Sequence, residues 1–316
     1  FTGKPASVKH VHMAAGKTTQ MEINTYTYDH AERLTKVEHS LNGVKVTLPA
    51  NTYDELGRLS GKSLHGSASN KLAYAYNIRN WIESISSGGL FNISLYYGYN
   101  GNVSRMVCRC PGDNKTYGYN FAYDNLSRLT SAQSLIGGVI TLGYATNYSY
   151  DKNGNLLHLR RGGQTGLSGT GIIDNLSFTL NGNQLKAVND DATATASNGF
   201  EFKDGAKLAT EYMYDANGSL IKDLNKGIEI QYNLLNLPSQ VKFSDGSTIT
   251  YTYGADGVKL RTVHKIGGVT TTTDYCDNVI YENGTVKQLL TEEGYVSLSD
   301  KKYHYYLKDH QGNNRV

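Results

Sequence analysis

The sequence predicts an all-β protein made of tandem β-hairpins that form a curved or spiralling antiparallel sheet. The composition supports this fold class, because 25 Tyr and 34 Gly accompany only 4 Pro and 4 Met among 316 residues. An aromatic-turn pattern also recurs along the whole chain. Aromatic and β-branched side chains pack well on pleated strands, and glycine accepts the positive φ angles of tight turns. These two observations favour strands and turns over helical bundles.

One aromatic residue marks each predicted repeat, and the steps between successive anchors run from 18 to 36 residues. A sustained period of this length indicates a repeat architecture. We therefore predict a single domain over residues 1–316, with an N-terminal connection over 1–25 and about eleven repeats over 26–316. The anchors are Tyr28, Tyr53, Tyr76, Tyr97, Tyr123, Tyr150, Phe178, Tyr214, Tyr232, Tyr253 and Tyr275.

Within a unit, an aromatic residue is followed by a turn and then by an aliphatic residue. The pattern is plain in YDELGRL at 53–59, YDKNGNL at 150–156 and YDANGSL at 214–220. The Asp after the anchor can accept backbone amides two residues on, and Gly or Asn four residues after the anchor tolerates a left-handed φ. Each unit is therefore predicted to be a β-hairpin. The predicted turn glycines are Gly57, Gly101, Gly154, Gly182, Gly218 and Gly257.

A second apolar or aromatic side chain usually precedes the anchor by two residues, as Tyr26, Tyr74 and Tyr212 do. A spacing of two places both side chains on one face of a strand. An isolated hairpin is marginally stable in water, so neighbouring units must pair edge to edge and bury a continuous face. A buried Tyr hydroxyl needs a partner or water, and we therefore expect this Tyr-rich face to be partly wet.

The repeated YDxxGRL pattern and the end of the chain resemble the Rhs or YD-repeat family. The ending, YYLKDHQGNNRV at 305–316, is similar to the motif YYLxDHLGNVR near the end of bacterial cores of this family, with departures at Gln311 and Asn314. The resemblance implies a spiral of hairpins forming a hollow shell around a C-terminal effector, often a toxin. Such shells occur in secreted bacterial proteins, insecticidal toxin complexes and teneurins. The matching residues of this terminal motif, predicted to span 303–316, are Tyr306, Asp309, His310, Gly312 and Arg315.

The resemblance implies a non-catalytic structural region of a secreted or cell-surface bacterial protein. Its expected partners are its own C-terminal effector domain or neighbouring YD repeats absent from this chain. The Asp-Pro-x-Gly cleavage signature of the family is not found here, so no cleavage residue is assigned. We interpret the chain as a piece of shell with too few units to close, hence an open sheet with exposed edges. The alternative is a cell-surface adhesion or carbohydrate-binding module that uses tandem aromatic and Asn side chains to bind glycans.

Charge and hydropathy exclude two kinds of partner. The chain has 31 basic and 28 acidic residues, a net charge of +3, which is too balanced to indicate a nucleic acid or an anionic membrane. The longest apolar stretches, such as residues 137–142, fall far short of the roughly 18 residues of a membrane-spanning helix. We expect no membrane insertion.

The search for reactive groups predicts no enzyme, no catalytic residue, no cofactor and no metal site. Residues 15–18 (AGKT) lack the leading Gly of a phosphate-binding loop, and residues 151–155 (DKNGN) fit a hairpin turn better than a calcium loop. Three cysteines, Cys108, Cys110 and Cys276, make no disulfide framework. His10 and His12 are interpreted as a frayed N-terminal pair rather than as metal ligands. Adjacent titratable groups at 308–310 point apart in a strand or turn, so a structural role is expected there.

The arginines after the anchors and Trp81 each allow two interpretations. Arg33, Arg58 and Arg128 follow their anchors by five residues, where they could meet acidic glycans or form a solvated face with weak ion pairs. Trp81 is the only Trp and occupies the same place in its unit. It could stack on a sugar ring, or it could pack at the edge of a hairpin, because Trp is usually mostly buried.

Overall fold

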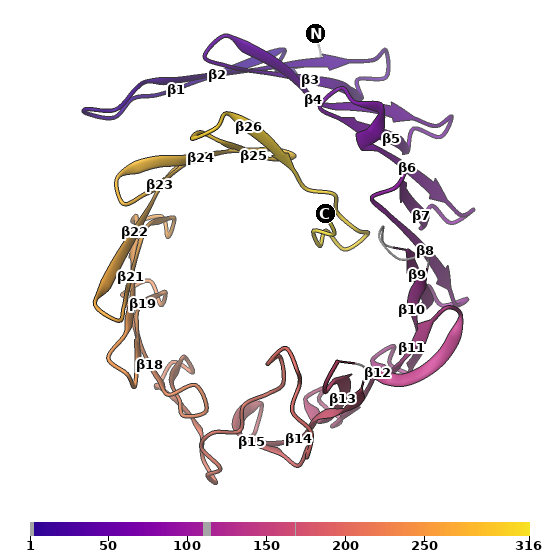
Figure 1. Ribbon diagram of the computed structural model, residues 1–316, viewed down its shortest axis with the longest axis vertical. Helices are drawn as coiled ribbons and strands as arrows, with labels where there is room; N and C mark the ends of the chain where they lie inside the picture. The colour runs from indigo at the N-terminus through magenta and orange to yellow at the C-terminus, as the bar shows by residue number, and fades with distance from the viewer. Residues whose placement is uncertain (1–2, 110–114, 168) are drawn as a thin grey trace. The chain divides into compact units, whose positions relative to one another are not determined.

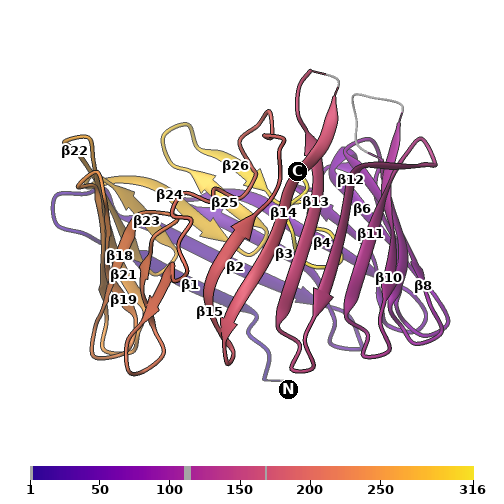
Figure 2. The ribbon, with the colours of Figure 1, turned by 90° about the horizontal axis from the view of Figure 1, so that it is seen from below.

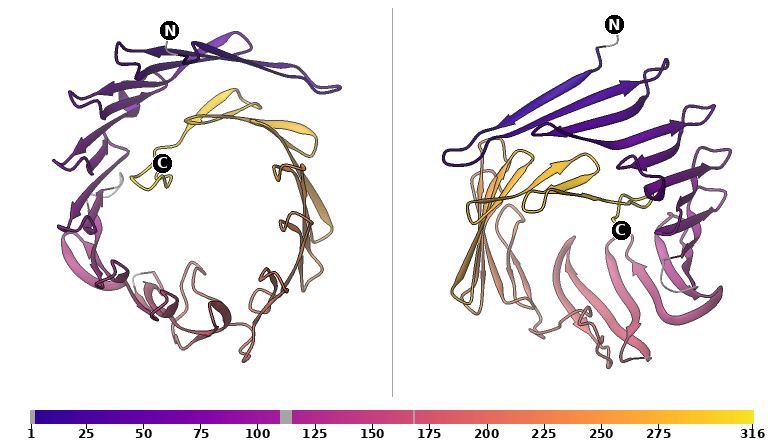
Figure 3. Two further views of the ribbon diagram at one scale, coloured as in Figure 1. Left: turned by 180° about the vertical axis from the view of Figure 1, so that it is seen from behind. Right: turned by 45° about the horizontal axis from the view of Figure 1, so that its top comes forward.

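The computed structural model describes residues 3–109, 115–167 and 169–316, and it confirms the predicted all-β class. Cys110 lies outside the described residues. The described part of the chain contains β-strands β1 to β26 and one short 3₁₀ helix, η1 (Ala68–Asn70), and the strands can be followed in order in Figures 1 to 3. No helix in these residues is long and apolar enough to cross a membrane.

The strands form two sheets in which hydrogen-bonded neighbours follow one another in sequence. The first sheet contains β1 (Ser7–His12), β2 (Gln20–Tyr28), β3 (Leu34–Leu41), β4 (Val44–Tyr53), β5 (Leu59–Leu64), β6 (Lys71–Tyr76), β7 (Ile82–Ser87), β8 (Phe91–Tyr97), β9 (Val103–Arg109), β10 (Thr116–Tyr123), β11 (Leu129–Ile136), β12 (Val139–Tyr150), β13 (Leu156–Gln164), β14 (Thr170–Asn181) and β15 (Gln184–Asp190). The second contains β16 (Tyr212–Tyr214), β17 (Leu220–Asp223), β18 (Ile228–Tyr232), β19 (Pro238–Phe243), β20 (Thr248–Tyr253), β21 (Lys259–Ile266), β22 (Val269–Cys276), β23 (Val279–Glu282), β24 (Thr285–Thr291), β25 (Gly294–Ser297) and β26 (Lys302–Tyr305).

Contacts divide the chain into two compact units. Unit 1 comprises Phe1–Tyr117 together with Leu289–Val316, and unit 2 comprises Gly118–Gln288. The assignment of a single domain stays a prediction. Unit 1 therefore combines the first repeats with the last residues of the chain.

The N-terminal residues differ from the expected connection, because they already contain a hairpin. Strand β1 pairs antiparallel with β2 over all six of its residues, from Ser7 opposite Thr25 to His12 opposite Gln20. His10 is not frayed, since its Nδ1 lies 3.7 Å from a carboxylate oxygen of Glu22. The physical reason is the segment SVKHVH, in which β-branched Val alternates with polar residues and suits a strand.

A β-bulge recurs at the anchor tyrosines. In β4 and β5, Thr52 pairs with Gly61 but Tyr53 pairs with Leu59, so Ser60 is left without an opposite residue. The same shift precedes the anchors Tyr28, Tyr76, Tyr97, Tyr150, Tyr214, Tyr232 and Tyr253. A bulge of this kind bends the strand and increases its twist. The bulge therefore bends the strands at these eight anchors.

The main hydrophobic core of unit 1 lies on one face of β5 to β8. Its buried side chains are Leu64, Leu72, Ile85, Phe91, Ile93, Leu95 and Leu307. All but Leu307 come from consecutive strands, and each is at most 4% exposed. The last strands and the terminal motif therefore contribute to the core of the first repeats.

Candidate functional site

Most repeat turns are built by an Asp or Asn side chain directly after the anchor, although Gly98 and Gly254 take this place after Tyr97 and Tyr253. The Asp54 N–H donates to the carbonyl oxygen of Arg58 (2.9 Å) and the Gly57 N–H donates to that of Asp54 (3.0 Å). Asp54 Oδ1 accepts the N–H groups of Leu56 (3.0 Å) and Arg58 (2.9 Å). Because this one carboxylate satisfies two turn amides, the turn needs no other partner. The residues in the same role are Asp29, Asn77, Asp124, Asp151, Asp215 and Asn233.

The turn places a residue with positive φ four positions after the anchor. The predicted turn glycines have φ values of +81° at Gly57, +91° at Gly101, +92° at Gly154, +60° at Gly182, +84° at Gly218 and +82° at Gly257. Glu32, Asn80, Ser127 and Asn236 occupy this position in other units with φ values between +58° and +63°. A side chain there is strained by the left-handed backbone, which is why glycine is common at this position.

The hydroxyl group of the anchor tyrosine connects successive units. Tyr76 Oη donates to the Leu59 carbonyl oxygen at 2.9 Å, and Leu59 begins the return strand of the preceding unit. Burial raises the pKa of Tyr76. We expected each such hydroxyl group to bond either a protein group or water, and here it bonds a backbone carbonyl oxygen. Equivalent bonds join Tyr53 to Leu34, Tyr97 to Ile82, Tyr150 to Leu129, Tyr214 to Leu185, Tyr232 to Leu220 and Tyr253 to Pro238, and Tyr28 bonds Pro5.

The arginines after the anchors bind within the repeats. Arg58 Nε donates to Asp54 Oδ2 at 2.6 Å, and its guanidinium lies 4.8 Å from the ring centre of Tyr76, the next anchor. Arg33 and Arg128 make the same two contacts with their own Asp and with the following anchor. The pKa of Asp124 is lowered by the backbone N–H and then the side chain of Arg128. Each guanidinium therefore ties one turn to the next repeat.

Trp81 takes the place of arginine in its unit. Its ring lies 5.1 Å from that of the next anchor, Tyr97, and the guanidinium of Arg79 lies 5.1 Å from the Trp81 ring on its own turn. A Cβ atom added at Gly101 would meet the Trp81 ring at 3.2 Å. Trp81 is half-buried. These contacts agree with packing at a hairpin edge, one of its two sequence interpretations.

The remaining anchors are Phe178, Tyr275 and Tyr123, and the first two are not followed by the five-residue turn. Phe178 lies within β14 opposite Val188, and Tyr275 lies within β22 opposite Ile280. Two-residue turns, rather than the five-residue turn, follow both strands. Tyr123 ends β10, directly before the Asp124 turn. A Phe has no hydroxyl group, so Phe178 cannot make the bond that links the other units.

The terminal motif forms the same turn outside the regular strands. Asp309 Oδ1 accepts the N–H groups of Gln311 (2.9 Å) and Asn313 (3.0 Å), and Gly312 has a φ of +84°. Asp309 Oδ2 binds the Arg315 guanidinium at 2.7 Å. Burial opposes ionisation of Asp309, but these donors outweigh it and its pKa is lowered. This carboxylate is occupied by structural bonds, as the sequence interpretation expected.

Other residues of the terminal motif have different surroundings. The Tyr306 N–H donates to the Glu293 carbonyl oxygen at 2.9 Å. Burial lowers the pKa of His310, whose Nδ1 is buried and has no hydrogen-bond partner among the described residues. Leu307 is 3% exposed in the core of unit 1. The motif therefore anchors the end of the chain chiefly through Leu307 and Asp309.

Residues 289–316, which we call the C-terminal segment, contact the first hairpins of unit 1 through side chains. A half-buried bond joins Lys62 Nζ to Glu293 (2.6 Å), and an exposed bond joins the Tyr26 hydroxyl to Glu292 (3.2 Å). Two His–Tyr contacts join His39 Nδ1 to the Tyr303 hydroxyl (2.8 Å) and His65 Nδ1 to the Tyr305 hydroxyl (2.9 Å). The segment is therefore held on the repeats by polar side chains together with Leu307.

A buried hydrogen-bond chain lies under this segment. His39 is fully buried, and its Nε2 lies 3.0 Å from Oε1 of Glu22, which is 4% exposed. Its Nδ1 binds Tyr303, whose pKa is raised to about 12 by burial and by the Glu22 charge. We did not single out these residues from the sequence. Glu22, His39 and Tyr303 come from β2, β3 and β26, and no local pattern marks residues that distant in the chain.

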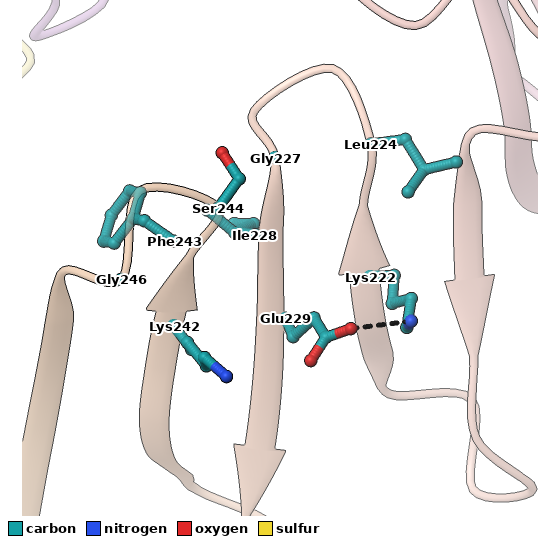
Figure 4. A pocket seen from close by; sticks show the side chains of 9 residues that line it. All are labelled: Lys222, Leu224, Gly227, Ile228, Glu229, Lys242, Phe243, Ser244 and Gly246. Carbon is teal, nitrogen blue, oxygen red and sulfur yellow. Dashed lines mark ion pairs between the residues drawn. The ribbon is translucent and has the colours of Figure 1, made fainter.

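The surface has hollows in both units. In unit 2, a hollow of about 490 Å³ lies beside β17 to β19, where Lys222 pairs with Glu229 at 2.7 Å (Figure 4). Figure 4 marks no other ion pair between the side chains drawn there. In unit 1, a hollow of about 560 Å³ is lined by Trp81, Tyr96 and Tyr99. Among residues 3–109, 115–167 and 169–316, no group of three His, Cys, Asp or Glu could hold a metal ion.

Comparisons with known proteins establish the fold. No protein-family model and no curated protein matches this chain. A chain in the structure of a Photorhabdus luminescens Tc holotoxin pore with mutated TccC3 is similar to it, with a TM-score of 0.70 and 15% identity over 97% of this chain. Chains in the crystal structures of TcdB2-TccC3-TEV and TcdB2-TccC3-Cdc42 are similar with TM-scores of 0.66 and 0.60, at 14% and 15% identity, over 98% and 93% of this chain. This chain spans 17% of the length of each of these three chains.

Proposed function

We propose that this chain, whose fold supports its assignment to the Rhs or YD-repeat family, is a non-catalytic part of a shell. The shell would enclose or present a C-terminal effector or toxin domain of a secreted or cell-surface bacterial protein. The observation that carries this proposal is the agreement of fold along 97% of the chain with a Tc holotoxin chain. The repeat contacts support it, because the Asp, Arg and anchor Tyr side chains are used to join one hairpin to the next.

The full-length gene product provides the test of this enclosure. It would be expressed with its own downstream region and digested with a protease under native conditions, and the fragments would be identified by mass spectrometry. We expect the downstream domain to resist cleavage while the repeats are folded and to be cleaved once they are unfolded. A downstream domain cleaved equally fast in both states, or a gene product without any downstream domain, would contradict enclosure.

A carbohydrate-binding module is the second candidate, and the unit 1 hollow favours it. Tyr99 and Ile78 are 98% and 99% exposed at its edge, and Tyr96 is 53% exposed. Arg79 donates to the Tyr99 carbonyl oxygen at 2.8 Å, which holds two neighbouring turns together. Exposed aromatic faces beside polar side chains are suited to sugar rings.

A glycan array distinguishes this second candidate. The intact chain would be compared with Tyr99→Ala and with Leu234→Ala, which alters the equivalent, fully exposed turn position of another repeat. We expect any bound glycan to be lost from Tyr99→Ala alone. Unchanged binding by Tyr99→Ala would exclude this hollow as the glycan site.

A further inference from the structure

The C-terminal segment forms a cavity with the turn between β3 and β4 in unit 1. The cavity measures about 340 Å³, which is within the range of small-molecule sites. Aliphatic side chains from both sides line it, namely Leu41, Val44, Val296 and Leu298. Lys301 and Tyr303 line it from β26 and its preceding turn. The cavity thus combines an apolar wall with one cationic residue, Lys301, and with polar residues that include Tyr303 and Thr18.

Two other polar side chains of the cavity, Asn42 and Gln20, already have hydrogen-bond partners. Asn42 Oδ1 accepts the Met21 N–H at 2.8 Å, and Asn42 Nδ2 donates to Gln20 Oε1 at 2.8 Å. Gln20 Nε2 donates to the Thr18 carbonyl oxygen at 3.1 Å. Lys301 is exposed at the solvent side and makes no ion pair within the described residues, whereas its neighbour Lys302 pairs with Asp300 at 3.5 Å. The ammonium group of Lys301 is therefore available to an anion.

Tyr303 connects the cavity to the buried chain of His39 and Glu22. With one proton on Nε2, neutral His39 donates to Glu22 and accepts the Tyr303 hydroxyl hydrogen at Nδ1. If His39 takes up a second proton, both ring nitrogens donate, so Tyr303 Oη becomes an acceptor and its hydrogen can turn to a ligand. Glu22 stays hydrogen-bonded in both states.

The charged, titratable and hydrogen-bonding groups around this chain lie on β1, β2 and β26 and directly after β5. His10 on β1 lies 3.7 Å from Glu22, and Asn24 on β2 donates to Glu22 at 3.1 Å. The His65 ring, just after β5, lies 5.8 Å from the Tyr303 ring and 5.7 Å from Tyr305, which is on β26 beside Tyr303. Glu22 is the carboxylate in direct contact with His39, so a second proton on His39 would face an opposite charge.

We propose that this cavity binds a small amphipathic carboxylate and that His39 takes up one proton from solvent when it binds. The aliphatic part lies against Leu41, Val44, Val296 and Leu298. The carboxylate accepts hydrogen bonds from the Lys301 ammonium and the Tyr303 hydroxyl, and protonated His39 donates to Tyr303 Oη. No covalent bond changes, and the proton is the single species exchanged with water. This site does not depend on the shell proposal.

Isothermal titration calorimetry of the intact chain with hexanoate and with hexan-1-ol tests the ligand class. We expect hexanoate to bind about tenfold more tightly, because only the carboxylate meets Lys301. Lys301→Gln weakens this preference, whereas the control Lys302→Gln retains it in full. Val44→Trp fills the cavity at a side chain that is 66% exposed, and it weakens binding of both probes. Equal affinity for the two probes, or binding unaffected by Val44→Trp, would overturn the proposal.

The proton is tested by repeating the hexanoate titration in buffers with different ionisation enthalpies. We expect an uptake of about one proton per hexanoate with the wild-type chain and no uptake with His39→Gln. If His39→Gln does not fold, the pH dependence of the wild-type Kd for hexanoate tests the proton uptake instead. Hexanoate must then bind more tightly as the pH falls, by up to about tenfold per pH unit, whereas the Kd of hexan-1-ol must not change. Hexanoate binding without proton uptake would overturn the proposal.

Discussion

Strands β5 to β8 in unit 1 and β18 to β20 in unit 2 have the same repeat pattern but different burial. Both contain the anchor hydroxyl bond, from Tyr76 to Leu59 and from Tyr253 to Pro238, each at 2.9 Å. Leu64, Ile85 and Leu95 in the first region are at most 1% exposed. The corresponding aliphatic residues of the second region, Ile230, Val241 and Ile249, are only half-buried.

This difference indicates that the repeat pattern and the fully buried core depend on different contacts. The turn and the hydroxyl bond depend on residues within two neighbouring units. The dry face of β5 to β8 also contains Leu307, which comes from the terminal motif. The two regions differ in the turns as well, since Arg58 bridges two units in the first region while Leu237 and Val258 occupy its place in the second.

The largest expected effect is on core packing. Leu95→Ala should lower the free energy of unfolding by about 2–5 kcal/mol, because it leaves a cavity in a closed core. Ile249→Ala should lower it by about 1–2 kcal/mol, because a half-buried side chain loses less contact with its surroundings. Urea-induced unfolding followed by circular dichroism measures both. Equal losses at the two positions would contradict the proposed difference in burial.

Removing the anchor hydroxyl groups should affect both regions alike. Tyr76→Phe and Tyr253→Phe should each lower the free energy of unfolding by about 1 kcal/mol, because each leaves one carbonyl oxygen without its donor. The control is Phe178→Tyr, which adds a hydroxyl at an anchor outside the scheme and should bring no comparable stabilisation. A loss at Tyr76 alone would show that the hydroxyl bond matters only beside the dry core.

A smaller effect is expected for the bridging arginine. Arg58→Met removes the bonds to Asp54 and to Asn80 Oδ1 and the contact with the Tyr76 ring, and it should cost about 1 kcal/mol. The cost should shrink at high salt, because part of it is an ion pair. Thermal melts at two salt concentrations measure it, with Val258→Met in the second region as the matched control. A cost that does not depend on salt would show that the ion pair with Asp54 does not contribute to it.

The smallest expected effect is on acid stability. Hydrogen bonds led by the Arg33 backbone N–H lower the pKa of Asp29, and the bonds from Arg58 outweigh burial to lower that of Asp54. A lowered folded-state pKa gives stability that is present above the unfolded value, about 3.9, and lost as pH falls through the folded value. Hydrogen exchange below pH 4 should therefore show earlier loss of protection at these turns than at the Asn233 turn. Simultaneous loss would contradict this assignment.

The repeat turns could be predicted from the sequence because all their contacts are local. Asp54, Gly57 and Arg58 lie within five residues, and their spacing suffices to indicate a turn with a left-handed residue. The β-bulge before eight of the anchors was not predicted, because it depends on how two strands are paired. The roles of Arg58 and Trp81 stayed open for the same reason, since each is decided by the next anchor ring.

The strand at residues 7–12 was missed because terminal position was given more weight than its alternating pattern. The buried chain of Glu22, His39 and Tyr303 was missed for a stronger reason. His39 and Tyr303 are 264 residues apart, and each is an ordinary strand residue in its own segment. Only packing of the C-terminal segment on the first hairpins brings them within hydrogen-bonding distance.

The sequence by itself determined the all-β class, the positions of the turns and the resemblance to YD repeats. It could do so because Asp, Gly and aromatic side chains impose their preferences over a few residues, and a repeated pattern repeats the result. The tertiary structure decided which aliphatic faces are dry, which hydroxyl groups meet carbonyl oxygens and where the cavity beside Tyr303 lies. Those features depend on contacts between segments distant in the chain, which burial and hydrogen bonding select only once the strands are packed.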